Sequence, residues 1–128
     1  MPDLCAFDYA IVRVVPRVER EEFLIAGVIV YCRELRYLAA RVRLDSARLA
    51  ALAPHLDAEA VQANLELIPR ICAGGPEAGR LGELSQVERF RWLVAPHSTI
   101  IQTSPVHPGL CADPAATLEQ LAARVLGD

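Results

Sequence analysis

Three segments near the start of the chain carry the hydrophobic patterns of β-strands. Residues 7–15 end at Pro16, residues 23–32 are apolar almost throughout, and residues 37–44 alternate between apolar and polar positions. A period of two indicates a strand with one buried and one solvated face. Because the charged segment 17–22 is short, we expect a hairpin between the first two strands and an antiparallel meander of all three.

The second of these segments, residues 23–32, is apolar on both of its faces. Strands of this kind lie in the middle of a sheet that is covered on both sides. We therefore expect it to be the central strand, with its outer face against a helix or a partner subunit. A homodimer is reasonable on this ground.

Four helices are predicted, each beginning after a residue that can cap its first turn. These capping residues are Asp45, Asp57, Ser85 and Asp113. Glu88 follows Ser85 by three positions and completes a capping-box pattern. Proline should limit the first three helices, because Pro54, Pro69 and Pro96 each stop or kink a helix that reaches them.

The remaining segments are predicted as one strand and two loops. The glycine-rich segment 74–82 should be irregular and mobile. Residues 98–103 read as a fourth short strand, followed by a rigid loop through Pro105, Pro108 and Gly109. The chain is therefore expected to form a single α+β domain over residues 1–128. Its antiparallel sheet should have three to four strands, the N-terminal meander plus one C-terminal strand, covered by about four helices.

Composition narrows the classes of function. The 128 residues are 53% hydrophobic, which suffices for one core, and their net charge of -3 argues against nucleic-acid binding through overall charge. All 13 cationic side chains are arginine, so no lysine is present for a Schiff base or a phosphate loop. Neither a leader segment nor a membrane span is expected, which favours the cytoplasm. The four cysteines are far apart and should be small buried thiols, and no cofactor is expected.

Polar side chains concentrate between residues 91 and 107, around a helix end, a short strand and a proline-rich loop. Together with one charged residue of the first strand they form the candidate ligand-binding set, which could hold an anion or the edge of a nucleotide. The set is Arg13, Arg91, His97, Ser98, Gln102, Ser104 and His107. Some members also have a structural explanation: a solvated helix face for Arg91, the start of a turn for Ser98 and an exposed strand for Gln102.

Arg13 is a single charge in an otherwise apolar strand, and burying it without a partner would cost several kcal/mol. An ion pair with Asp8, Glu21 or Glu22 is the favoured explanation over a basic sheet face shared with other arginines.

Metal and hydrolase chemistry are not favoured by the spacing of the candidate groups. His97, His107 and Cys111 are ligand types that suit zinc, but no close pair and no fourth ligand accompany them, so no metal is expected. Ser98 and Ser104 lack the Gly-x-Ser-x-Gly pattern of a hydrolase nucleophile. No catalytic residue is assigned.

Two stretches of the chain together resemble a known family. The first contains Tyr9, Val12, Arg13, Pro16, Phe23, Gly27 and Val28, and the second is the run FRWLVAPHSTIIQTSPVHPGLC from Phe90 to Cys111. They are similar to the domain of unknown function 3037 family of small bacterial proteins. The chain departs from the family pattern at Ile25, where asparagine is expected, and at His97 and His107, where arginine is common.

The resemblance implies a partner rather than an activity. Genes of this family often lie beside a serine/threonine kinase of the toxin type, so a non-enzymatic interaction module that accompanies such a kinase is the leading hypothesis. It would bind through the doubly apolar second strand and the surface of residues 91–107. The alternative is a small enzyme or binding protein for a phosphorylated or nucleotide ligand, built on Arg13, Arg91, His97 and His107.

Overall fold

A five-stranded antiparallel sheet forms the centre of the computed structural model, which describes residues 3–17, 20–96 and 100–127. The strands are β1 (Cys5–Val14), β2 (Leu24–Cys32), β3 (Tyr37–Val42), β4 (Ile101–Thr103) and β5 (His107–Cys111). Their order is β3-β2-β1-β4, and β5 pairs with the other half of the β1 edge that β4 occupies. The expected meander and the α+β class are confirmed.

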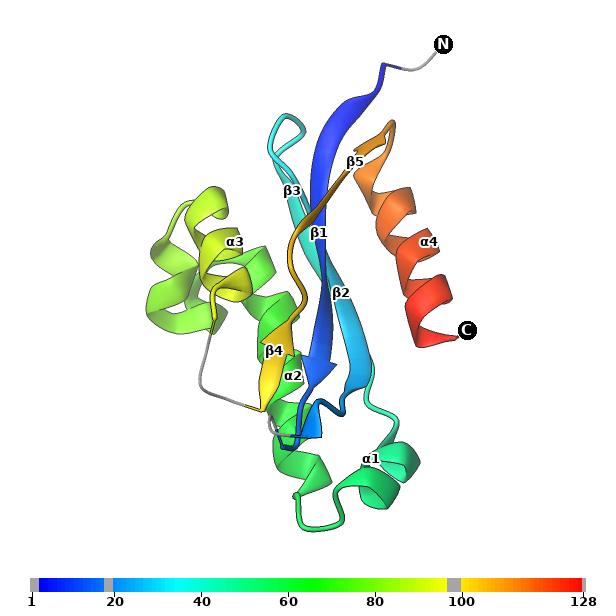
Figure 1. The fold of residues 1–128 in the computed structure, drawn as a ribbon. Coiled ribbons are helices and arrows are strands. Elements are labelled where there is room, and N and C mark those ends of the chain that lie inside the picture. Colours follow the sequence, from blue (N-terminus) through cyan, green and yellow to red (C-terminus); the bar gives the residue numbers. More distant parts are fainter. Residues whose placement is uncertain (1–2, 18–19, 97–99, 128) are drawn as a thin grey trace.

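Helices cover both sides of this sheet (Figure 1). They are α1 (Ser46–Leu52), α2 (Ala58–Ala73), α3 (Gln86–Val94) and α4 (Pro114–Leu126), with a 3-10 helix η2 (Pro76–Glu83) between α2 and α3. The cores show that α2 and α3 pack on one face and α4 on the other. We refer to these as the α2 face and the α4 face of the sheet.

Strand β2 is central, as its apolar pattern predicts. It is buried from Ala26 to Cys32, with Ile29 in the core of the α2 face and Val30 in the core of the α4 face. Helix α4 therefore fills the position that the sequence left open to a helix or a partner subunit. Only the start of the apolar segment is uncovered, since Phe23 and Ile25 are each 43% exposed.

The four predicted helix starts are confirmed by their capping hydrogen bonds. The Asp45 carboxylate accepts from the backbone N–H of Arg48 at 3.1 Å. Asp57 and Asp113 cap α2 and α4 in the same way, each accepting at 3.0 Å from the N–H two residues on. Ser85 and the residue three positions later form the expected capping box. Each side chain satisfies a backbone donor that the first turn leaves unpaired.

The sequence prediction differs from the structure at three places that contain proline or glycine. Helix α2 continues past Pro69 to Ala73, because Ile71 and Cys72 beyond the proline are buried. Burying such side chains contributes about 1.5–3 kcal/mol each and offsets the roughly 3 kcal/mol that an interior proline costs. The segment predicted as irregular is largely the 3-10 helix η2, whose two turns meet at Gly79.

The third error concerns residues 107–111, which were predicted as a loop and form strand β5. Its backbone pairs with β1 from Cys5 to Tyr9. A strand at the edge of a sheet tolerates Pro108, because a missing N–H costs nothing where no strand accepts it. The fourth predicted strand is shorter than expected and begins at Ile101, while residues 98 and 99 lie outside the described residues. None of the described helices has the length and apolar content needed to cross a membrane.

Candidate functional site

Arg13 and Gln102 of the candidate set are neighbours across β1 and β4. Their register places both side chains on the α4 face, beside the exposed start of β2. The Arg13 guanidinium lies over the ring of Phe23, with its central carbon 4.4 Å from the ring centroid. A cation over an aromatic face is stabilised by about 0.5–1 kcal/mol at an exposed site and by about 2 kcal/mol when desolvated, and the half-buried Arg13 lies between these limits.

The expected ion pair of Arg13 is not found. Its guanidinium makes no salt bridge with any residue that the structure describes, and its Nε is buried without a hydrogen-bond partner. Asp8 belongs to the alternate positions of β1 and so points to the opposite face of the sheet. Stacking on Phe23 takes the place of the predicted carboxylate.

Ser104 is part of the sheet rather than of a binding surface. It is 4% exposed, and its Oγ accepts a hydrogen bond from the N–H of Ile11 at 2.9 Å. The Ser104 N–H donates in turn to the Ile11 carbonyl at 2.8 Å. The residue thus joins the end of β4 to the beginning of β5 along one edge of β1.

The other candidate residues do not converge with Arg13. His107 is exposed on β5, where its ring lies 5.2 Å from that of Tyr9. Arg91 is exposed on α3, which packs on the opposite face of the sheet. His97 and Ser98 lie outside the described residues. The phosphorylated-ligand hypothesis needs Arg13 and Arg91 at one ligand, and the sheet separates these two side chains.

A groove of about 290 Å³ lies between α2, α3 and β4. It includes part of the 91–107 surface that the sequence proposed for a partner. Its lining residues are mostly apolar: Asn64, Leu67, Ile68, Ile71, Trp92, Leu93, Ile100, Ile101, Gln102 and Thr103. Two large side chains are left half exposed here, Leu67 at 44% and Trp92 at 42%.

The local sequence explains why this groove is apolar and open. Ile68 and Ile71 lie on the buried stripe of α2, whereas Leu67 is one position off that stripe and reaches the surface. Trp92 stands in the same relation to buried Leu93 on α3. Each helix therefore presents one extra apolar residue beside its core contacts.

The side chains that line the groove are mostly apolar. Among the described residues that line it, none carries a carboxylate, imidazole, thiol or guanidinium. Its polar side chains are the amide of Asn64 and the hydroxyl of Thr103, which donates to the Val94 carbonyl at 3.4 Å, whereas the side chain of Gln102 points to the other face of the sheet. Such groups can orient a bound chain by hydrogen bonds, but they do not act as general acids or bases near neutral pH.

Three cysteine thiols have a raised pKa. Burial raises the pKa of Cys72 to about 12. The pKa of Cys5 rises to about 11, chiefly because its thiol hydrogen-bonds to the Glu34 side chain. Burial also raises the pKa of Cys111. Since the thiolate is the reactive form, these three groups are protonated and inert at neutral pH.

Residues 9–126 match the family model described as a protein of unknown function (DUF3037). The chain belongs to the DUF3037 family. The match includes nearly every described element of the DUF3037 protein, from β1 to the end of α4, and it confirms the resemblance seen in the two sequence stretches. No curated protein and no solved structure matches the chain.

The residue that sequence reasoning missed is Leu67. The buried stripe of α2 includes Val61, Leu65, Ile68 and Cys72, and Leu67 falls outside the period of these residues. A large apolar residue beside a complete stripe was the available signal, since such a residue has no core position to fill. Trp92, the single tryptophan of the chain, is 42% exposed and lines the same groove.

Proposed function

We propose that this DUF3037 protein is a non-enzymatic protein-interaction module. Its groove between α2, α3 and β4 would take an apolar side chain from a partner protein, with Trp92 and Leu67 as the principal contacts. The observation that carries the proposal is this apolar groove with two half-exposed large side chains and without a titratable group.

The exposed parts of these two side chains are enough to support binding. An aromatic residue buries about 150–250 Å² when fully covered, so the 42% of Trp92 that remains exposed represents about 1.6–2.6 kcal/mol at 25 cal/mol per Å². The 44% of Leu67 that remains exposed adds about 0.7–1.3 kcal/mol by the same reasoning. Together they reach the range of an interface hot spot, where tryptophan is enriched.

The groove also fits the way in which a helix or an extended segment docks. Apolar side chains of the partner would enter between α2 and α3, while Asn64 and Thr103 would meet its backbone polar groups. The partner suggested by the family resemblance is a serine/threonine kinase of the toxin type, since genes of the family often lie beside one. It is the first protein to test.

The single tryptophan of the chain offers a direct test. Protein labelled with 5-fluorotryptophan has one fluorine resonance, which reports on the groove. We expect purified kinase to shift or broaden this resonance in a saturable manner, because the indole passes from partial solvent contact into an interface. Size-exclusion chromatography of the same mixture should show a complex.

Two leucine variants separate the groove from the rest of the surface. Leu67→Ala should weaken the complex, whereas Leu35→Ala changes a side chain of similar exposure, 48%, in the turn between β2 and β3. That turn lies at the end of the sheet away from α1, outside the groove (Figure 1). Complete absence of a complex, with both proteins folded, would count against the kinase as partner. Equal weakening by the two variants would count against the groove.

A further inference from the structure

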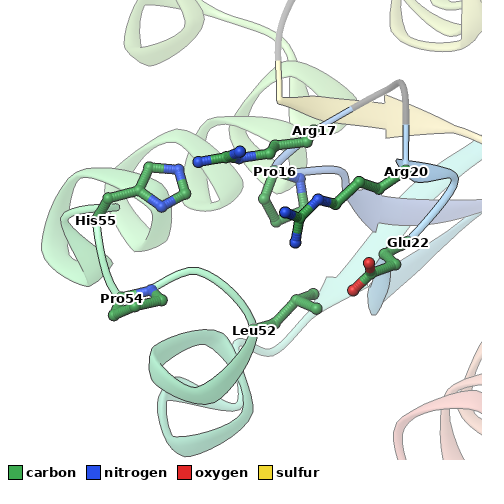
Figure 2. Close-up of a pocket in the computed structure, with 7 residues that line it drawn as sticks. All are labelled: Pro16, Arg17, Arg20, Glu22, Leu52, Pro54 and His55. Atoms are coloured by element: carbon green, nitrogen blue, oxygen red, sulfur yellow. The ribbon is translucent and has the colours of Figure 1, made fainter.

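A second concave site lies where the β1–β2 connection meets the α1–α2 connection (Figure 2). Its volume is about 190 Å³, and it lies outside both the groove and the candidate set from the sequence. The residues that line it are Pro16, Arg17, Arg20, Glu22, Leu52, Pro54 and His55. This volume is below the roughly 300–1,000 Å³ of pockets for drug-sized ligands, so the site suits a small group.

Three nitrogen-bearing side chains are directed toward the same space. Figure 2 shows the guanidinium groups of Arg17 and Arg20 and the imidazole of His55 around the pocket, with Glu22 across from His55. The backbone N–H of Arg20 donates to the Arg17 carbonyl at 3.2 Å, which holds the two arginines on one turn. On the other wall, the N–H of Leu56 donates to the Ala53 carbonyl at 3.0 Å and closes the turn that carries His55.

The two guanidinium groups lack the partners that other arginines of the chain have. Arg41 donates to the Glu119 carboxylate at 2.7 Å, and Arg48 lies 3.5 Å from that of Asp45. Among the residues that the structure describes, no side chain pairs with Arg17 or Arg20, although Glu22 lines the same pocket. Two like charges around one cavity repel each other, and an anion placed between them removes that repulsion.

We propose that this pocket binds a phosphate monoester group through Arg17, Arg20 and His55. A dianion matches the charge of two guanidinium groups, and its oxygens accept their N–H donors in the planar, forked geometry that arginine offers. The imidazole supplies a further donor. Pro16, Leu52 and Pro54 form the apolar part of the wall, which leaves the phosphate as the recognised feature.

Glu22 opposes the binding of an anion in this pocket. Its side chain lines the pocket, and its carboxylate repels an anion bound there, so it limits the affinity that two arginines could otherwise reach. Replacement by glutamine keeps the size and removes the charge. We expect Glu22→Gln to bind phosphate more tightly by about 1.4- to 5-fold, the range of exposed charge pairs.

The test is an NMR titration of the full chain that follows arginine Nε–H and histidine signals. Inorganic phosphate and O-phosphoserine are the two probes, and acetate at equal ionic strength is the comparison. We expect saturable shifts at Arg17, Arg20 and His55 with both phosphates and much weaker shifts with acetate. Arg20→Ala should weaken phosphate binding about tenfold, as the loss of one charge-assisted hydrogen-bond donor predicts.

Arg33→Ala is the matched control, because Arg33 is exposed in the turn at the other end of β2. Tighter binding of O-phosphoserine than of inorganic phosphate would identify a phosphorylated ligand, and equal binding would show that the phosphate alone suffices. Shifts that do not saturate, or a phosphate affinity that Arg20→Ala leaves unchanged, would overturn the proposal. Because the groove is not involved, either result leaves the proposed protein interaction to its own test.

Discussion

Replacement of Ser104 by alanine should destabilise the fold without touching any exposed surface. The Ser104 hydroxyl accepts from the N–H of Ile11 at 2.9 Å and donates to the Pro105 carbonyl at 2.9 Å. Alanine removes both bonds and leaves the Ile11 donor without an acceptor in the middle of β1. An orphaned buried donor costs about 1–3 kcal/mol, more than the net value of an ordinary hydrogen bond.

The expected change in melting temperature follows from the size of the chain. An entropy of unfolding of about 2.1 cal/mol/K per residue amounts to about 0.27 kcal/mol/K for 128 residues. A loss of about 1–3 kcal/mol therefore lowers Tm by about 4–11 °C. Calorimetry measures this shift, and hydrogen exchange of the Ile11 amide should accelerate in the same variant.

Ser46→Ala provides the comparison, since Ser46 is exposed in the first turn of α1. It should change the stability by no more than about 0.5 kcal/mol. If Ser104→Ala unfolds at the temperature of the wild type, or if its Ile11 amide stays equally protected, the hydroxyl does not hold β4 and β5 on the edge of β1. The binding role first considered for Ser104 would then need to be tested again.

Three further predictions concern other parts of the fold. The capping box lowers the pKa of Glu88 below its ordinary value of 4.5. The ionised carboxylate therefore stabilises the folded state above pH 4.5, and this stabilisation is lost as the pH falls through the lowered pKa. Glu88→Gln should abolish this part of the acid dependence measured by urea unfolding. A Cβ at residue 109 would lie 2.5 Å from the Phe7 ring, so Gly109→Ala should lower stability by about 1–3 kcal/mol in chemical denaturation, and adding Phe7→Leu should restore part of it. Cys72, whose pKa is about 12, should not react with a thiol reagent at pH 8 until the protein unfolds.

The fold was largely predictable because the local sequence patterns and the tertiary packing favour the same helices and strands. Alternation marked the strands, and each helix began where an aspartate or serine could accept from the first turn. The central position of β2 followed from its two apolar faces, which only a covered strand can bury. The helix that covers its second face could not be identified from the pattern alone, since a partner subunit would satisfy the same requirement.

The errors arose where tertiary contacts outweigh local preference. Pro69 has the local character of a helix end, yet the buried residues after it keep α2 intact. Pro108 argued against a strand, but pairing with β1 provides backbone hydrogen bonds that the sequence does not reveal. Both cases depend on a neighbour far away in the chain, which single-sequence reasoning cannot place.

The candidate site was less predictable than the fold. Polar residues of the 91–107 segment were candidates because ligand sites need polar groups. Ser104, however, hydrogen-bonds within the sheet, and Arg91 lies on the opposite face from Arg13. The groove beside this segment depends on Leu67, which is exposed because of the way α2 is oriented on the sheet. The arginines of the second pocket approach His55 only through the packing of two loops.

The ratio of two dissociation constants tests the proposed interaction most directly. Titration calorimetry of the purified kinase with Leu67→Ala and with Leu35→Ala compares the groove with an equally exposed leucine elsewhere. Covering the exposed part of Leu67 predicts binding weaker by about 3- to 9-fold for Leu67→Ala and no change for Leu35→Ala. Identical dissociation constants for these two variants and the wild type would contradict the assignment of the groove as the contact surface.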